Sequence, residues 1–142
     1  MYGLQDNMAE FIQRKIDEGN WVHEVNDISA AATVTFVTPA ANKRFHLYSA
    51  KVVLDSIAGT AIHNLQTMAE LLINGTKEDE TFIGSAGNVM NTVDSGGAWG
   101  IRGDGKFDVT GLYLDGDAAK VVAIKAVSQA CVGTITGWLE DI

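Results

Sequence analysis

The sequence predicts a mainly β protein: a single antiparallel β-sandwich or jelly-roll-like domain with an N-terminal helix. About seven to nine short β-rich runs are separated by turn signals, which is typical of such sandwiches. The 15 glycines suit tight turns, and the 142 residues fit one domain. Strands and helices do not alternate, which argues against a parallel α/β sheet. We divide the chain into a helical arm, residues 1–20, and a sandwich domain, residues 21–142.

The N-terminal helix is expected over residues 6–18. Apolar residues recur there at helical spacing, namely Leu4, Met8, Phe11, Ile12 and Ile16. Asp6 or Asn7 could cap its start, and Gly19 could end it. Two roles are open for this helix: it covers one end of the core, or it is an arm that docks on a neighbouring subunit.

Two pairs of runs near the ends of the chain are expected to frame the sandwich. Thr33–Thr38 and Arg44–Leu54 read as strands joined by a turn that contains Pro39, the one proline of the chain. Lys120–Ser128 and Val132–Leu139 read as the clearest hairpin.

The second of these strands changes phase along its length. Phe45 and Leu47 share one parity, whereas Val52 and Leu54 have the opposite parity. A β-bulge near Ser49 would reset the phase, or the strand is covered on both faces. We favour the bulge, or burial of the strand against a neighbouring subunit.

The middle of the chain is less distinctive. Ala61–Ile73 carries an apolar stripe at helical spacing and predicts a short internal helix, although two short strands fit as well. Asn74-Gly75 is a strong turn signal, and Lys77–Glu80 is expected to be a solvated acidic tip. Lys106–Leu114 predicts one continuous strand.

The net charge of the chain limits the classes of partner that it can bind. The net charge is −8 and the pI is about 4.6, and the ten Lys and Arg residues are scattered along the chain. Nucleic-acid binding needs a basic surface, so we expect no nucleic-acid partner. An anionic membrane surface is disfavoured for the same reason, and we expect no membrane partner.

No catalytic, cofactor or metal site is predicted. The histidines, His23, His46 and His63, do not lie at metal-ligand spacing from one another or from Cys131. Cys131, the single cysteine, begins an apolar run and reads as a buried structural thiol rather than a nucleophile. The glycine-rich segment 96–106 lacks the ending of a phosphate-binding loop.

A structural calcium ion is the alternative to a metal-free protein. Carboxylates that could bind it flank one predicted strand: Asp104, Asp108, Asp115 and Asp117. Their spacing is not that of an EF-hand, and we expect no bound metal.

Two segments resemble parts of small structural virion proteins of tailed phages, of the capsid decoration or cementing type. They are Val34–Tyr48, with its strand, Pro-containing turn and second strand, and the closing run Val121–Gly137. The resemblance implies a non-enzymatic protein on the capsid surface of a virion, assembled in the host cytoplasm. It also implies a homo-oligomer, with three copies expected, that contacts copies of itself and a major capsid protein. The alternative function is a ligand-binding β-sandwich that recognises a sugar or a host receptor.

Five residues are candidates for subunit contacts. Trp21, Trp99 and Trp138 are named because tryptophan is enriched at interface hot spots, with burial in the core as the alternative. Met8 and Phe11 join them from the apolar face of the helix.

Overall fold

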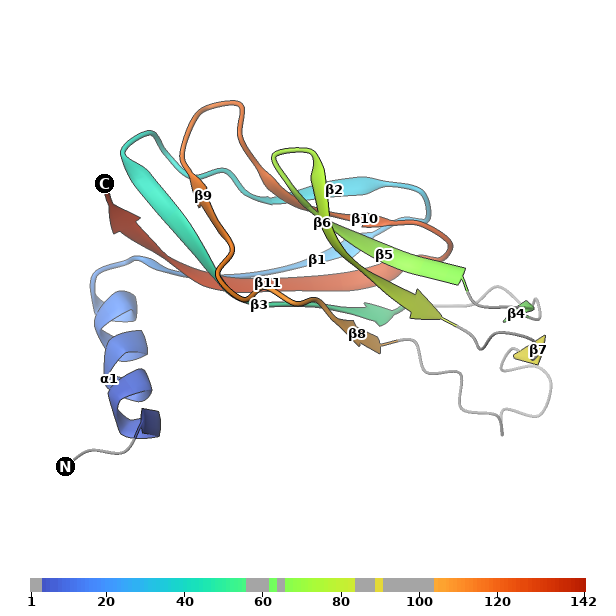
Figure 1. Cartoon of the computed structure of the whole chain (residues 1–142), viewed down its shortest axis with the longest axis horizontal. Helices are drawn as coiled ribbons and strands as arrows, with labels where there is room; N and C mark the ends of the chain where they lie inside the picture. Colours follow the sequence, from blue (N-terminus) through green and yellow to red (C-terminus); the bar gives the residue numbers. More distant parts are fainter. Residues whose placement is uncertain (1–3, 56–61, 64–65, 84–88, 91–103) are drawn as a thin grey trace.

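The protein is a β-sandwich with one helix at its N-terminal end (Figure 1). The computed structural model describes residues 4–55, 62–63, 66–83, 89–90 and 104–142. Two antiparallel sheets, here named sheet A and sheet B, face one another in two layers (Figure 1). The expected fold class is therefore confirmed.

Among the described residues, sheet A has five strands. β11 (Cys131–Asp141) lies at its centre, between β1 (Trp21–Ile28) and β3 (Lys43–Leu54). The far side of β3 is paired at its two ends by the short strands β8 (Asp104–Lys106) and β9 (Tyr113–Asp115). The strands that come first and last along the chain are thus neighbours in this sheet.

Sheet B has four strands in the order β2, β10, β5, β6. Their bounds are Thr33–Val37, Val122–Ala126, Gln66–Ile73 and Thr76–Ile83, respectively. A separate two-stranded pair joins β4 (Ile62–His63) to β7 (Val89–Met90).

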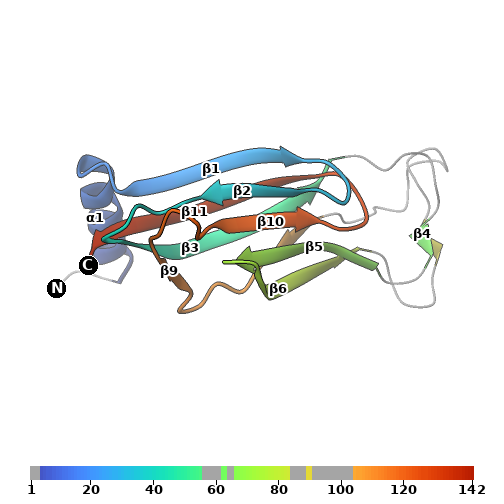
Figure 2. The same ribbon diagram turned by 90° about the horizontal axis from the view of Figure 1, so that it is seen from above.

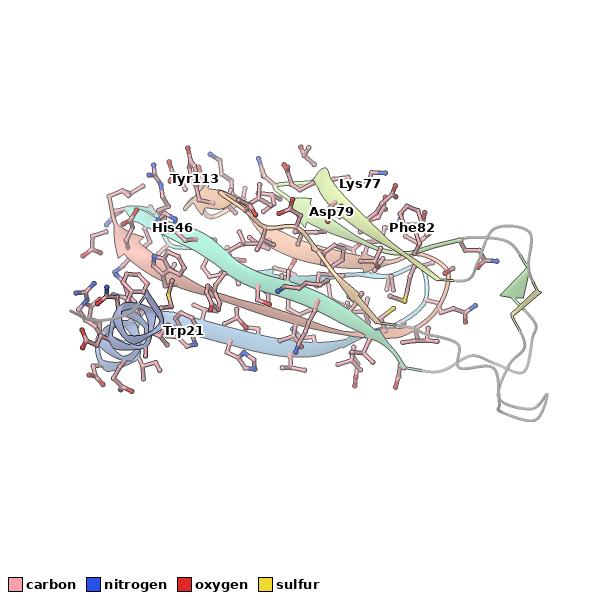
Figure 3. All side chains as sticks on the ribbon, turned by 60° about the horizontal axis from the view of Figure 1, so that its bottom comes forward. Trp21, His46, Lys77, Asp79, Phe82 and Tyr113 are labelled. Carbon is pink, nitrogen blue, oxygen red and sulfur yellow. The ribbon has the colours of Figure 1, made fainter. Side chains whose placement is uncertain are left out.

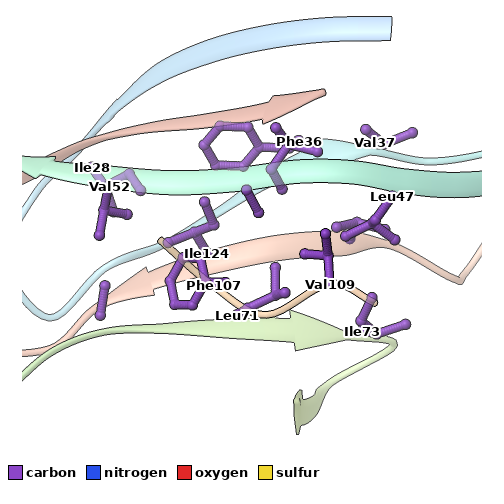
Figure 4. Close-up of a cluster of buried hydrophobic side chains, with 14 of the residues drawn as sticks. Ile28, Phe36, Val37, Leu47, Val52, Leu71, Ile73, Phe107, Val109 and Ile124 are labelled. Carbon is purple, nitrogen blue, oxygen red and sulfur yellow. The ribbon is translucent and has the colours of Figure 1, made fainter. Parts of the chain in front are cut away.

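The hydrophobic core fills the space between the two sheets (Figure 4). Sheet A contributes Phe45, Val52 and Ile135, and sheet B contributes Leu71 and Ile124, all of them fully buried. The segment that links β8 to β9 adds its own buried side chains, Phe107 and Val109.

The predicted closing hairpin is wrong, although both of its strands exist. β10 belongs to sheet B and β11 to sheet A, so residues 127–130 cross between the layers instead of turning within one sheet. β1 to β2 and β2 to β3 cross in the same way. Alternating burial looks the same along a strand whether its chain neighbour lies beside it or across the core, which is why the sequence pattern did not separate the two.

Three local expectations are corrected. The short internal helix expected for residues 61–73 is wrong over β5, and the alternative of short strands is right there, because residues 66–73 form a strand paired on both sides by β10 and β6. The supposed acidic tip, Lys77–Glu80, is part of β6. The strand expected over residues 106–114 is interrupted by a turn, in which Gly111 has φ 71°.

The turn and bulge predictions are confirmed. Asn74 and Gly75, with φ 51° and 80°, join β5 to β6 as a tight hairpin. In the pairing of β3 with β11, Ser49 lies opposite Thr136 and Leu47 lies opposite Gly137, which leaves Tyr48 as the extra residue of a bulge. The buried set consequently changes from Phe45 and Leu47 to Ala50 and Val52.

The helix α1 spans Leu4–Asp17 and extends away from one end of the sandwich (Figure 1). Gly19 ends it with φ 75°, as expected, and Arg14 and Lys15 occupy its last turn. The predicted caps are wrong, because Asp6 and Asn7 lie inside the helix. Within the described residues, no helix is long and apolar enough to span a bilayer.

Candidate functional site

A row of four ring side chains crosses the outer face of sheet A, near the end that carries α1. The strand register places Trp21 opposite Trp138, Trp138 opposite His46, and His46 opposite Tyr113. Directly opposed residues project from the same face of a sheet, so the four rings stand side by side. We call these four residues the aromatic row; Figure 3 labels Trp21, His46 and Tyr113.

Trp138 is the centre of the row and the anchor of the helix. Its ring stacks on that of His46, with centroids 5.0 Å apart and planes inclined by 17°. From α1, Phe11 meets the Trp138 ring edge-on, at 5.0 Å and 82°. Lys15 adds a hydrogen bond from its Nζ to the backbone oxygen of Leu139, at 3.4 Å. A few contacts thus hold α1 against the sandwich.

Charged side chains line the row on the side nearer the end of β11. The register places Arg44 between Glu140 and Asp115. Arg44 donates two hydrogen bonds to the Asp115 carboxylate, 2.5 and 3.1 Å long, and its guanidinium lies 4.4 Å from the centroid of the Tyr113 ring. The Nε2 atom of His46 lies 2.7 Å from Oε1 of Glu140.

These contacts shift two acidic groups in the same direction. The hydrogen bond from Arg44 holds the pKa of the Asp115 carboxyl below its ordinary value. The hydrogen bond with His46 likewise lowers the pKa of the Glu140 carboxyl. Both carboxylates are therefore charged and engaged at neutral pH, which orders the polar edge of the row.

The apolar stripe of α1 is only partly covered. Phe11 and Ile12 are half-buried, whereas Met8 is 38% and Ile16 is 48% exposed. Soluble helices usually bury such a stripe. Together with the aromatic row, these side chains make one end of the molecule unusually rich in residues that favour protein contacts.

A shallow depression of about 430 Å³ lies beside β3, where Tyr48 meets the segment between β8 and β9. Its acidic groups are engaged by backbone: Asp79 accepts hydrogen bonds from the N–H groups of Glu80 and Asp108, and Asp108 accepts one from that of Thr110. The depression is thus built mainly from groups that stabilise the turn.

The remaining candidates are Cys131 and the acidic residues considered as metal ligands. Cys131 is buried, and burial raises the pKa of its thiol to about 11, which keeps it protonated and poorly nucleophilic. Within the part of the chain that the structure describes, no three His, Cys, Asp or Glu side chains gather as a metal site would require. Asp115 pairs with Arg44 instead, and Asp117 accepts a hydrogen bond from the backbone N–H of Ala119.

Comparison with models of known protein families and with curated protein sequences finds no match. The resemblance to phage virion proteins therefore stays a prediction.

The structure brings together most of the predicted contact residues. Trp21 and Trp138 lie on sheet A, and Phe11 and Met8 lie on α1 at the same end. Both tryptophans are half-buried at the surface rather than in the core. Trp99 lies outside the described residues.

Sequence reasoning missed three members of the surface: Arg44, His46 and Tyr113. The first two share a parity along β3, which is a usable signal for one face of a strand. Their grouping with Tyr113 depends on the pairing of β3 with β9, and no sequence pattern specifies that register.

Proposed function

We propose that the protein is a non-enzymatic structural component of a virion, a capsid decoration or cementing protein that acts through subunit contacts. The observation that carries the proposal is α1: an amphipathic helix that extends from the sandwich, anchored on Trp138, with Met8 and Ile16 exposed. The two segments that resemble phage virion proteins supply the class of assembly. The partners are copies of the chain itself and a major capsid protein.

The composition of this end supports a role in protein contacts. Interfaces are enriched in Trp, Tyr, Met and Arg, and an exposed amphipathic helix can lay its apolar face into a groove of another protein. Trp138, Tyr113, Arg44 and the α1 stripe supply these residue types together. The acidic net charge of −8 suits a protein that does not contact packaged nucleic acid.

The proposal is tested on particles from the organism that encodes the protein. We expect the protein to co-purify with intact particles, and particles that lack it to break at a lower temperature. Ile16→Asp places a charge on the exposed stripe of α1 and should weaken binding to such particles at least about tenfold, since one buried unpaired charge costs more than about 1.4 kcal/mol.

Gln13→Asp is the matched control, because Gln13 is exposed on the polar side of α1 and the variant carries the same new charge. It should bind as the wild type does. Absence of the protein from purified particles, or unchanged binding by Ile16→Asp, would contradict the proposal.

One observation favours a second function, the binding of a sugar or a glycosylated receptor. Tyr113 is 51% exposed and lies beside the Arg44–Asp115 pair, so an aromatic ring adjoins both donor and acceptor groups. If this is the function, a glycan array should show binding that Tyr113→Ala abolishes. Tyr48→Ala, at a comparably exposed tyrosine of the same sheet, should leave it intact.

A further inference from the structure

β1 is a long edge strand of sheet A. Among the described residues it pairs with β11 on one side and with no strand on the other (Figure 2). The strand is eight residues long, Trp21–Ile28. Such an edge presents a row of backbone donors and acceptors that another strand can use.

The ladder between β1 and β11 fixes which backbone groups point to this free edge. The N–H of Leu139 donates to the oxygen of Asn20 at 2.8 Å, directly before the first register pair, Trp21 with Trp138. Hydrogen-bonded and non-hydrogen-bonded pairs alternate in an antiparallel ladder. The even-numbered residues of β1 therefore bond to β11, and the N–H and C=O groups of Trp21, His23, Val25 and Asp27 point outwards.

This phase limits how a second β1 could pair with the first. Outward-pointing groups of one strand must meet those of the other, so odd-numbered residues have to face odd-numbered residues. The same condition places the core-facing side chains of both copies on the same face of the joined sheet. A register shifted by one residue would put the core-facing side chains of one copy next to the solvent-facing side chains of the other. The condition is met only by registers in which one residue of β1 lies opposite the same residue of the second copy. We name each of these registers by that central residue.

Among these registers, the one centred on Val25 is self-complementary. It places Val25, which is 52% exposed, against Val25 of the second copy. His23 then faces Asp27, and Glu24 faces Asn26, so each carboxylate gains a possible hydrogen-bond donor. A register centred on Glu24 would oppose two identical carboxylates, and one centred on Asn26 would leave Asp27 against a valine.

The other long edge shows the contrast. β6 ends sheet B and carries four consecutive charged residues, Lys77 to Glu80. Registers centred on Glu78, Asp79 or Glu80 each oppose two identical carboxylates, which protects that edge against self-pairing. β1 has no such protection in the register centred on Val25.

We propose that two copies of the protein associate through β1, in antiparallel register centred on Val25, so that their two A sheets form one continuous sheet. This two-fold pair takes the place of the three-copy assembly that the resemblance implies. This interface is separate from the apolar stripe of α1 and goes beyond the proposed function. Loss of self-association and loss of binding to particles are therefore distinguishable outcomes.

Sedimentation velocity of the full-length protein over a range of concentrations tests this interface. The wild type should show a monomer–dimer equilibrium. Val25→Pro removes an N–H that points to the free edge, where proline is tolerated, so circular dichroism should show a folded monomer. Its dimer dissociation constant should rise more than about tenfold, because the substitution acts twice at a two-fold axis.

A charge exchange tests the register. His23→Glu places a carboxylate opposite Asp27 of the other copy and should weaken the dimer about tenfold, whereas adding Asp27→Lys should restore it to within about threefold. Asp55→Lys makes the same charge change outside β1 and should not rescue His23→Glu. A wild type that stays monomeric up to about millimolar concentration, the upper range of weak affinities, would overturn the proposal. So would a folded Val25→Pro that dimerises normally, or a failure of the double variant to recover.

Discussion

Gly137 shows how closely individual residues are specified. It lies on β11 beside the bulge of β3, where an added Cβ would overlap the carbonyl oxygen of His46 and the Phe45 ring. We expect Gly137→Ala to lower the free energy of unfolding by about 3 kcal/mol, since a backbone oxygen cannot move aside as a side chain can. Urea denaturation measures the change.

Gly133 is the matched control on the same strand. A Cβ there would meet only the ends of side chains, the nearest being the Phe36 ring at 2.8 Å. Gly133→Ala should therefore cost about 1 kcal/mol. Equal costs at the two positions would show that the bulge does not bring the backbones together as described.

Cys131 allows a direct measurement of burial, since it is the only thiol in the chain. Its pKa of about 11 and its buried position predict that a thiol reagent reacts with the native protein at about pH 8 far more slowly than with the unfolded chain. The reaction should accelerate in urea in step with unfolding. Rapid labelling of the native protein would contradict the assigned burial.

At the scale of the residue, the sequence predicted what depends on local periodicity. The phase change between Leu47 and Val52 could be identified because side-chain parity is visible in the sequence. The stacking of His46 on Trp138 could not, because those residues lie far apart along the chain and meet only through strand register.

At the scale of the element, α1 is joined to the sandwich by few contacts between described residues. Phe11 on Trp138 and Lys15 on Leu139 are its principal contacts with the sandwich. Removal of residues 1–18 should leave a cooperative unfolding transition and cost about 0.5–1.5 kcal/mol, the value of one aromatic pair. Phe11→Ala in the full chain should lower the free energy of unfolding by a similar amount and change the Trp138 fluorescence in the same way as the truncation does. A truncated chain that is unfolded would contradict this expectation.

For residues 61–73 the sequence left a helix and short strands open, and only the strand pairing decides between them. Residues 66–73 have helical spacing, yet β10 and β6 pair with them on both sides and bury Met68, Ala69, Leu71 and Ile73. Met68 is the extra residue of a bulge in the pairing with β6, so Met68 and Ala69 are buried at successive positions and the alternation that identifies a strand is broken there. In contrast, Asn74-Gly75 needed no partner to be identified as a turn, because its positive φ angles are a local property.

At the scale of the whole molecule, the pairing of the first strand with the last makes folding depend on the entire chain. β11 lies between β1 and β3 at the centre of sheet A. A chain that ends at Ala130 should show no cooperative unfolding transition. The complete chain should refold on a timescale of about milliseconds to seconds in stopped-flow measurements, as expected for non-local β topology.

Acid should destabilise the molecule through its surface carboxyls. The folded state lowers the pKa of Glu18, Asp108, Asp115, Glu140 and Asp141. Their stabilising contribution is complete above the ordinary values of 3.8 for Asp and 4.5 for Glu, and it is lost as the pH falls through the lower folded-state values. We expect the midpoint temperature of thermal unfolding to decrease as the pH falls below about 4.5. Asp115→Asn should make this decrease with pH shallower.

The extra residue at Tyr48 is the one position of β3 that the ladder with β11 does not need. Tyr48 is 44% exposed and should accept many substitutions. Deletion of Tyr48 would place Ser49 directly after Leu47, so that Phe45, Leu47, Ala50 and Val52 alternate regularly towards the core and the ladder with β11 loses its bulge. In the evolution of this protein, substitution or loss of this one residue is therefore expected to be tolerated, whereas a deletion elsewhere in β3 would turn the residues on one side of it to the opposite face.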